Sequence, residues 1–354
     1  MAQINEYLND LMQTMVKEGA SDLHIAEGRF PSIRVSSYLV PLVKKELVTK
    51  TIIQSFLSDL LSPTEKEIFI KTKEIDFSYQ FSPDIRFRGN GFFTQGAIGL
   101  VLRLIPKQVK SLRELNLPSV LETFTQKKQG FFLVVGPVGQ GKTTTLATMV
   151  EMINQTRTEH IITIEDPIEF VFEPKKSIID QREVRVDTED FHSALRGVFR
   201  QDVNVVMIGE MREPETISTA VTAAETGHLV FSTLHTNNAA QTIDRIIDSF
   251  PATQQNQIRY QIAGSLIGIL SQRLVPRISG GLIPAVELLI TNNAVQNLIR
   301  EKRTHEINTV IETSSDQGMV DMNRSLADLV RAGEITAENA YAYSFNPQLL
   351  EKLL

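Results

Sequence analysis

Residues 131–144 read FFLVVGPVGQGKTT, and this stretch decides the fold of the C-terminal half. An apolar run, Phe131 to Val135, leads into a loop of the form G-x-x-x-x-G-K-[ST], and a helical pattern follows the loop. Glycines allow successive backbone N–H groups to point at one spot, which the positive end of the following helix also faces. The stretch therefore predicts a strand, a phosphate-binding loop and a helix; a chance match on an ordinary strand-turn-helix is the alternative.

The loop predicts a binding site for a nucleoside triphosphate with Mg²⁺. In such loops the lysine, here Lys142, reaches the β and γ phosphates, and the hydroxyl group of Thr143 binds the metal ion. The residues expected to bind the nucleotide are Gly136, Pro137, Val138, Gly139, Gln140, Gly141, Lys142, Thr143 and Thr144.

Apolar strands alternate with helical patterns after residue 118. The expected strands are GFFLVV, HIITIE, VNVVMI and HLVFSTLH. This alternation indicates an α/β fold with a mostly parallel sheet and crossover helices. Parallel strands carry functional groups at their carboxyl ends, and three of these strands end in polar residues: Glu165 with Asp166, Glu210, and His235. We therefore expect these residues at the same sheet edge as Gly136.

Hydrolysis requires an activated water and compensation of charge, and these polar residues could supply both. Glu165 or Asp166 could orient the water, Glu210 could hold the magnesium ion or its water shell, and His235 could sense the γ-phosphate. Each has a structural alternative. Glu165 and Asp166 could form a turn with the next proline, Glu210 could cap a helix, and His235 could be a loop histidine that is simply hydrogen-bonded to its surroundings. His228 begins its strand at the opposite end, so we rank it below His235.

The N-terminal part, residues 1–105, has the pattern of a small α+β domain. It begins with a predicted helix at 4–17 and includes the predicted strands DFSYQF, IRFRGNGFF and IGLVLRLI. Residues 106–118 are polar and bounded by prolines, which is typical of a linker or hinge. The second domain is expected at 119–354, with helices from about residue 291.

Composition excludes several classes of protein. A net charge of -6 gives no support to nucleic acid or an anionic membrane as the main partner. The chain has no cysteine, which excludes disulfides and thiolate-bound zinc. It shows neither a signal-peptide pattern nor an apolar run of about 18 residues, so we expect a cytosolic protein without a spanning helix.

Several long motifs, taken together, resemble the type IV pilus retraction (twitching motility) ATPases of the secretion ATPase superfamily. They are GPVGQGKTTTLATMVEMIN, HIITIEDPIEFVFEPKKSIIDQREV, VVMIGEMREPETISTAVTAAETGHLVFSTLHT and QTIDRIIDSFPA. The resemblance identifies Glu165–Glu169 as the Asp box, Gly209–Glu210 as an atypical second acidic motif, and Gly227–His235 as the His box. It implies that Glu165 polarises the catalytic water and that Glu210 holds Mg²⁺ through water, with Asp166 as a further candidate metal ligand.

The resemblance also implies an architecture. It predicts a PAS-like α+β domain followed by a RecA-like P-loop ATPase domain, six copies in a ring, and ATP bound with Mg²⁺ between the domains. Arginines of the first domain, Arg86, Arg88 and Arg103, would close on the γ-phosphate; alternatively, Arg86 and Arg88 mark the solvent face of an edge strand. Arg196 and Arg200 could instead reach across a subunit boundary.

The resemblance favours retraction over assembly, because assembly motors usually carry a four-cysteine zinc site. The retraction motif A-I-R-N-L-I-R-E appears here as AVQNLIRE, Ala294 to Glu301, with Gln296 in place of arginine. Helical spacing predicts Ala294, Val295, Leu298 and Ile299 inward and Gln296, Asn297 and Arg300 outward. The implied partners are an inner-membrane platform protein at the cytoplasmic base of the pilus and an accessory retraction ATPase. The alternatives are an assembly or type II secretion ATPase, a nucleic-acid translocase, and a nucleotide-binding regulatory subunit that hydrolyses nothing.

Overall fold

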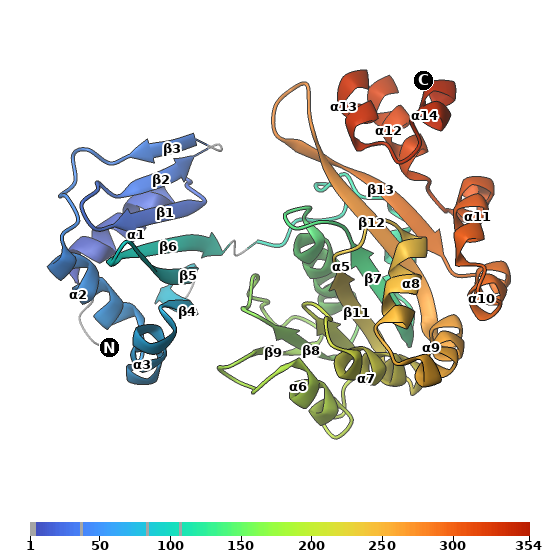
Figure 1. Ribbon diagram of the computed structural model, residues 1–354, viewed down its shortest axis with the longest axis horizontal. Helices are drawn as coiled ribbons and strands as arrows, with labels where there is room; N and C mark the ends of the chain where they lie inside the picture. The colour runs from blue at the N-terminus through green and yellow to red at the C-terminus, as the bar shows by residue number, and fades with distance from the viewer. Residues whose placement is uncertain (1–4, 36–37, 83–84, 106–107) are drawn as a thin grey trace. The chain divides into compact units, whose positions relative to one another are not determined.

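The computed structural model describes residues 5–35, 38–82, 85–105 and 108–354, and these form two compact units (Figure 1). The first unit runs to Gln108 and includes Pro167–Val171, and the second contains the rest of the chain. Of the predicted linker, positions 106 and 107 lie outside the described residues, as does Ile4 of the predicted first helix.

The described part of the first unit is an antiparallel sheet with three helices. The sheet has the order β3-β2-β1-β6-β5-β4. The elements are α1 (Glu6–Lys17), β1 (Asp22–Ala26), β2 (Ser32–Val35), β3 (Tyr38–Pro41), α2 (Lys50–Leu60), α3 (Pro63–Thr72), β4 (Glu74–Ser82), β5 (Ile85–Thr94) and β6 (Ala97–Ile105). The predicted first helix and the three predicted strands are confirmed.

The two faces of this sheet differ because strand side chains alternate. One face carries apolar residues such as Phe87 and Leu102, which join a core with residues of α1 and α2. The opposite face carries charged residues of β1, β5 and β6. β5 is an interior strand, so the interpretation of Arg86 and Arg88 as marking an edge strand is wrong.

The described part of the second unit alternates strands and helices and ends in helices. Its elements are α4 (Leu121–Thr125), β7 (Gly130–Val135), α5 (Lys142–Thr156), β8 (His160–Glu165), β9 (Ile178–Glu183), α6 (Phe191–Val198), β10 (Val205–Ile208), α7 (Pro214–Glu225), β11 (Leu229–Leu234), α8 (Ala239–Asp248), α9 (Ala252–Ser265), β12 (Leu266–Pro276), β13 (Leu282–Ile290), α10 (Asn293–Arg300), α11 (Ile307–Thr313), α12 (Met322–Arg331), α13 (Ala337–Tyr343) and α14 (Pro347–Leu353), with short 3₁₀ turns at Thr304–Glu306 and Ser315–Gln317.

The second sheet has the order β13-β12-β7-β11-β10-β8-β9. All neighbours pair in parallel except β13, which runs antiparallel to β12 at one edge. Every residue of β7, β10 and β11 is buried, as expected for strands covered on both faces. The predicted α/β fold with a mostly parallel sheet is therefore confirmed.

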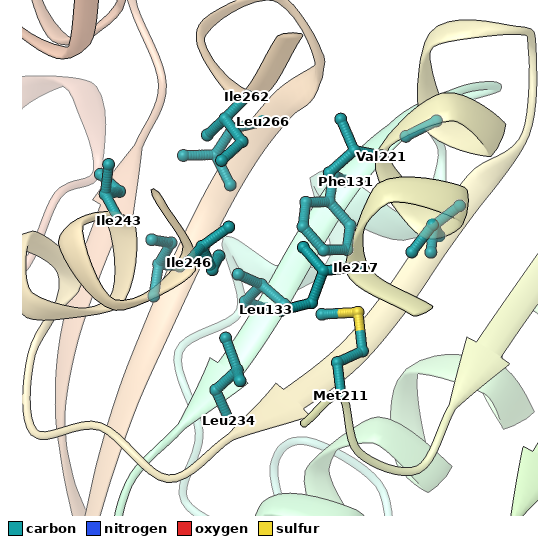
Figure 2. Packing of buried hydrophobic residues seen from close by; sticks show 14 of the residues in the cluster. Phe131, Leu133, Met211, Ile217, Val221, Leu234, Ile243, Ile246, Ile262 and Leu266 are labelled. Carbon is teal, nitrogen blue, oxygen red and sulfur yellow. The ribbon is translucent and has the colours of Figure 1, made fainter. Parts of the chain in front are cut away.

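The main core of this unit packs against β7 and fixes the ends of its strands. Figure 2 shows Phe131 and Leu133 of β7 among Ile217 and Val221 of α7, with Met211 close by. Met211 is 1% exposed and follows Glu210 directly, so its burial anchors the acidic residue at the end of β10.

The C-terminal helices cover the outer strands. Residues of α12–α14 form a second small core with Val275, Ile283 and Ala285 of β12 and β13. The predicted helix-rich tail is thus confirmed (Figure 1). None of the helices in the described ranges is both long and apolar enough to span a membrane.

Helix α10 contains the first seven residues of the AVQNLIRE motif, and three of the four positions predicted to face inward are buried. Val295, Leu298 and Ile299 are buried, whereas Ala294 is exposed, so its predicted inward position is wrong. The side chain of Asn292 caps the helix by accepting a hydrogen bond from the N–H of Val295. Ala294 therefore lies in the first turn, before the apolar stripe begins.

Candidate active site

The predicted polar residues meet at one edge of the second sheet. β7, β11, β10 and β8 are parallel neighbours, and their carboxyl ends lead directly into Gly136, His235, Gly209 and the residue after Glu165. The prediction that these groups share a sheet edge is therefore confirmed. Their order in the sheet puts the histidine strand between the phosphate loop and the strand that carries Glu210.

The phosphate loop depends on glycine geometry at its first residue. Gly136 has φ +148°, and a Cβ there would lie 2.5 Å from the carbonyl oxygen of Gln272. Strand β12 therefore passes against the loop too closely for any side chain. Gln272 also donates to the carbonyl oxygen of Gln140 at 2.7 Å and accepts from Thr145 at 2.8 Å. The side chain of Gln140 in turn accepts from the N–H of Leu274 at 2.6 Å.

Lys142 is held inside its own loop. Its Nζ donates to the carbonyl oxygens of Gly136 and Pro137, both at 2.8 Å, and only 8% of the residue is exposed. The third direction of the ammonium group faces Nδ1 of His235 at 3.3 Å. These contacts hold the charge above the loop, where phosphate oxygens would replace the carbonyl partners.

His235 connects the lysine to Glu210. Its Nε2 lies 3.4 Å from Oε2 of Glu210. Because an ammonium group can only donate, Nδ1 accepts from Lys142, and the ring proton belongs on Nε2, facing the carboxylate. Arg212 pairs with the same carboxylate at 2.7 Å. The partly exposed carboxyl group of Glu210 therefore lies one imidazole ring away from the phosphate loop.

The backbone of Gly209, the residue before Glu210, is hydrogen-bonded to residues of both neighbouring strands. The N–H of Gly209 donates to the carbonyl oxygen of Ile164 at 2.8 Å, and its carbonyl oxygen accepts from Thr233 at 2.6 Å. A Cβ at Gly209 would lie 3.4 Å from the oxygen of Ile164 and 3.6 Å from Cα of Glu165. These distances correspond to ordinary van der Waals contact, so the space at Gly209 would admit a small side chain.

Glu165 and Asp166 have different surroundings. Glu165 is 3% exposed and accepts from Thr163 at 2.7 Å and from Gln181 of β9 at 3.2 Å. Asp166 pairs with Arg185. Glu165 is therefore a buried carboxylate that accepts from neutral donors of two strands, whereas Asp166 is bound to a guanidinium group.

The three candidate arginines share one face of the first unit's sheet. Arg88 lies opposite Arg103 in the β5–β6 pair, and Arg86 is two residues before Arg88. Arg103 donates to the buried carboxylate of Asp22 at 2.7 Å. Burial alone would raise the pKa of Asp22, but hydrogen bonds from Ser21 and Arg103 outweigh burial and hold this pKa below its usual value.

A second arginine of this face also has an acidic partner. Arg88 lies 3.5 Å from Glu169, which belongs to the segment of the Asp box that groups with the first unit. Arg88 and Arg103 therefore both have acidic partners.

The other sequence candidates lie elsewhere. Arg196 and Arg200 are exposed, on α6 and in the turn after it. His228 stands at the start of β11, where Nδ1 is 3.0 Å from the carbonyl oxygen of Ala223 and the ring packs edge-on against Phe199. This contact explains His228 as a structural residue.

A cavity of about 360 Å³ adjoins the phosphate loop. Gly141, Thr144 and Thr145 line one side, and Leu274 and Pro284 of the β12–β13 hairpin line another. It lies at the start of α5, so a ligand with its phosphates in the loop could extend its remaining part into this space.

The described residues contain no cluster of three or more His, Cys, Asp or Glu side chains that could hold a metal ion. Magnesium commonly takes only one or two protein ligands beside waters and phosphate oxygens. The donor set here fits that pattern, with the Thr143 hydroxyl in the first turn of α5 and the Glu210 carboxylate beside His235.

The family of the chain follows from comparison of its sequence with known proteins. A family model described as "Type II/IV secretion system protein" matches residues 1–332. The chain belongs to this family. Within the type II/IV secretion system family, it is similar to the type IV pilus retractation ATPase PilT of Pseudomonas aeruginosa, with 41% identity over 94% of this chain and 96% of that protein. It is 44% identical to a twitching motility protein of Neisseria gonorrhoeae over 88% of this chain and 83% of that one.

Comparison with solved structures supports the same assignment. A crystal structure of the pilus retraction motor PilT with bound ADP has a TM-score of 0.91 and 42% identity, and covers 98% of this chain and 99% of that one. The ATPase DotB of Legionella pneumophila has a TM-score of 0.80 and 26% identity, with 95% of each chain covered. The chain is therefore a PilT-like member of the type II/IV secretion system family.

Sequence reasoning missed the residues that support the site from β12. Ser271, Gln272 and Arg273 are all buried, although they form a polar triplet inside the apolar run LIGILSQRLVP. Three consecutive polar residues in an otherwise apolar strand were the available signal, because buried polar groups need specific partners.

Proposed function

We propose that this chain is an ATP-hydrolysing motor that drives retraction of type IV pili. The observation that carries the proposal is the chain of contacts from Lys142 through His235 to Glu210, at the edge where the phosphate loop begins. The similarity to PilT over nearly the whole length supports the task of retraction.

The chemistry at this edge is in-line attack of water on the γ-phosphorus. Glu165 takes a proton from the attacking water as the bond from the water oxygen to phosphorus forms. The bond between the γ-phosphorus and the oxygen bridging to the β-phosphate breaks, and ADP leaves with that oxygen. Lys142 neutralises the developing charge, and His235 keeps its Nε2 proton and directs this N–H toward the carboxylate of Glu210.

Thr143 and Glu210 would hold Mg²⁺, Glu210 through a water, and the ion would supply charge neutralisation between the β and γ phosphates. Asp166 is a weaker candidate for this role because Arg185 already pairs with it. The adenosine part would extend into the cavity beside Thr144 and Leu274.

The larger assembly follows the same proposal. Six copies would form a ring on the cytoplasmic side of the inner membrane, with Arg86, Arg88 and Arg103 compensating charge on the γ-phosphate and residues 106–118 as the hinge between a PAS-like and a RecA-like domain. The ring would act on a platform protein, together with an accessory retraction ATPase. No role for nucleic acid is proposed, given the net charge of -6.

The first experiment is enzymatic. Phosphate release from ATP and Mg²⁺ is measured for the purified wild type, Glu210→Gln and the control Glu213→Gln. Glu213 is an exposed neighbour whose side chain makes no cap hydrogen bond. We expect Glu210→Gln to lose at least about a hundredfold in kcat and the control to keep it. Equal activity of all three proteins would contradict the assignment of Glu210.

The second experiment tests retraction. The gene is deleted in its native organism and restored as wild type or as Glu210→Gln, and pili are imaged. Excess pili that do not retract, in both the deletion strain and the Glu210→Gln strain, are expected. Loss of pili would instead indicate an assembly motor, and unchanged pili would reject both functions.

A further inference from the structure

The turn that follows His235 is held by side chains of two distant strands. Ser271 of β12 donates to the carbonyl oxygen of Asn237 at 2.6 Å, and Arg273 donates to the side-chain oxygen of the same residue at 2.8 Å. Glu287 of β13 accepts from the N–H of Ala239 at 2.8 Å. Two strands thus fix a turn that begins beside the phosphate loop.

These side chains are buried, although the backbone hydrogen bonds of the sheet do not require polar side chains here. Ser271 is 0% exposed, Glu287 4% and Arg273 8%. Backbone pairing between β12 and β13 runs unbroken from Gly268 to Pro276, so the sheet does not need these side chains for its own hydrogen bonds. Buried polar groups are costly unless they are hydrogen-bonded, and here their partners are in the turn.

Glu287 occupies the position of a helix cap. Ala239 is the first residue of α8, and the side chain of Asn238 already accepts from the N–H of Gln241. Glu287 accepts the N–H that the helix itself leaves unpaired, and a carboxyl group is favourable at that end of the helix. The first turn of α8 is therefore fastened to β13 through one side chain.

The hydrogen bond from the N–H of Ala239 to Glu287 is expected in both protonation states of the carboxyl group. Burial raises the pKa of Glu287 to about 7, and Asp321 also raises it, while the Ala239 N–H and Arg273 lower it. Burial lowers the pKa of Arg273, and Glu287 opposes that change. A carboxyl group retains an acceptor oxygen in either protonation state, so the hydrogen bond from Ala239 persists through the titration.

The opposite side of the same strand supports the phosphate loop. Between Ser271 and Arg273, Gln272 points the other way and bonds to Gln140 and Thr145. One hairpin therefore sets both the loop that carries Lys142 and the turn that begins at His235. The phosphate loop and the turn are therefore both positioned by side chains of the β12–β13 hairpin.

We propose that Glu287 is a positioning residue of the ATPase site, which fixes the 236–239 turn so that His235 stays between Lys142 and Glu210. The inference rests on the proposed role of His235 in hydrolysis. A displacement of about 1 Å at a reacting group can cost on the order of a hundredfold in rate, so a loosened turn should be visible in kcat.

The test compares two substitutions of similar size. Glu287→Gln keeps an oxygen that accepts from Ala239, and Glu287→Met removes it. We expect Glu287→Gln to keep kcat within about threefold and Glu287→Met to lose about 10–100-fold, as for removal of an orienting partner. The affinity for a fluorescent ADP analogue should change less than about threefold in both, because the phosphate loop is untouched. Leu289→Met, a packing change on the same strand, is the control and should keep kcat.

The decisive measurement is a double-variant cycle with His235→Ala. If Glu287 acts through His235, Glu287→Met should cause no further loss of kcat in the His235→Ala background. The inference is wrong if the two losses of kcat multiply in the double variant. It is also wrong if Glu287→Gln and Glu287→Met lower kcat equally. Parallel losses of kcat and nucleotide affinity would also overturn it.

The same cycle separates this inference from the proposed function. If His235→Ala alone leaves kcat unchanged, the proposed role of His235 fails, and the inference fails with it. If His235→Ala lowers kcat but Glu287→Met does not, the proposed function stands and only the inference is rejected.

Discussion

Nε2 of His235 lies 3.4 Å from Oε2 of Glu210, and this contact joins the phosphate loop to the acidic end of the neighbouring strand. The imidazole ring spans the space between a lysine that belongs to the loop and a carboxylate that belongs to β10. The two nitrogens of one ring therefore contact both groups, Nδ1 the lysine and Nε2 the carboxylate.

Substitution of this ring should separate binding from hydrolysis. His235→Ala is expected to reduce kcat by at least about tenfold while nucleotide affinity stays within about threefold, because the phosphate loop keeps its own contacts. Phosphate release and binding of a fluorescent ADP analogue measure the two quantities. His228→Ala is the control at the other end of β11, and an equal loss for both histidines would contradict the prediction.

Two glycines of the site should respond differently to alanine. At Gly136 the new Cβ would lie 2.5 Å from the oxygen of Gln272 and the φ of +148° disfavours any side chain, so we expect a loss of about 2 kcal/mol or more in unfolding free energy. At Gly209 the nearest atom is 3.4 Å away, and the loss should stay below about 1 kcal/mol. Denaturant midpoints measure both, and equal losses would refute the steric argument.

The titration of Glu287 predicts how stability depends on pH. Its pKa in the folded protein, about 7, is above its ordinary 4.5, so between these values the folded state binds the proton more strongly than the unfolded state. The unfolding free energy of the wild type, relative to Glu287→Gln, should therefore fall as pH rises from about 4.5 to about 7, by on the order of 3 kcal/mol. Denaturation at several pH values measures this difference; a flat difference would contradict the shifted pKa.

Asp22 and Arg103 allow the structural and catalytic roles of the arginine to be separated. If Arg103 compensates charge on the γ-phosphate, Arg103→Gln should lower kcat by about a hundredfold or more. Asp22→Asn keeps the guanidinium group and removes only its anchor, so the loss should be below about tenfold. Steady-state phosphate release measures both. Similar kcat values for the two variants would show that Arg103 serves only to pair with Asp22.

The features that could be predicted from the sequence are those that depend on residues close together along the chain. The phosphate loop, the strands before it and the acidic and histidine residues at strand ends are encoded within short stretches, and parallel topology then places Glu210 and His235 beside the loop. Contacts between distant segments could not be predicted in this way. Gln272 and Glu287 lie far along the chain from Gln140 and Ala239, and only the folded sheet brings them together.

Three further features could not be predicted because they depend on the surrounding structure. β9 was not predicted because IIDQRE is an edge strand with a mixed burial pattern, whose partner is visible only in the sheet. The exposure of Ala294 depends on a cap at Asn292, and the outer face of an interior strand has the same alternation as an edge strand. Periodicity gives the face of a side chain but not what covers that face.

The strand orders also constrain how the protein is made. β1 pairs with β6, the last strand of the first sheet, and β7 lies between β11 and β12. On the ribosome, the strand carrying the phosphate loop emerges long before Leu266–Pro276, the strand that supports it. A nascent chain that ends before Leu266 has the complete nucleotide-binding motif but lacks the strand that carries Gln272 and Leu274, so we expect nucleotide binding to be acquired late in synthesis.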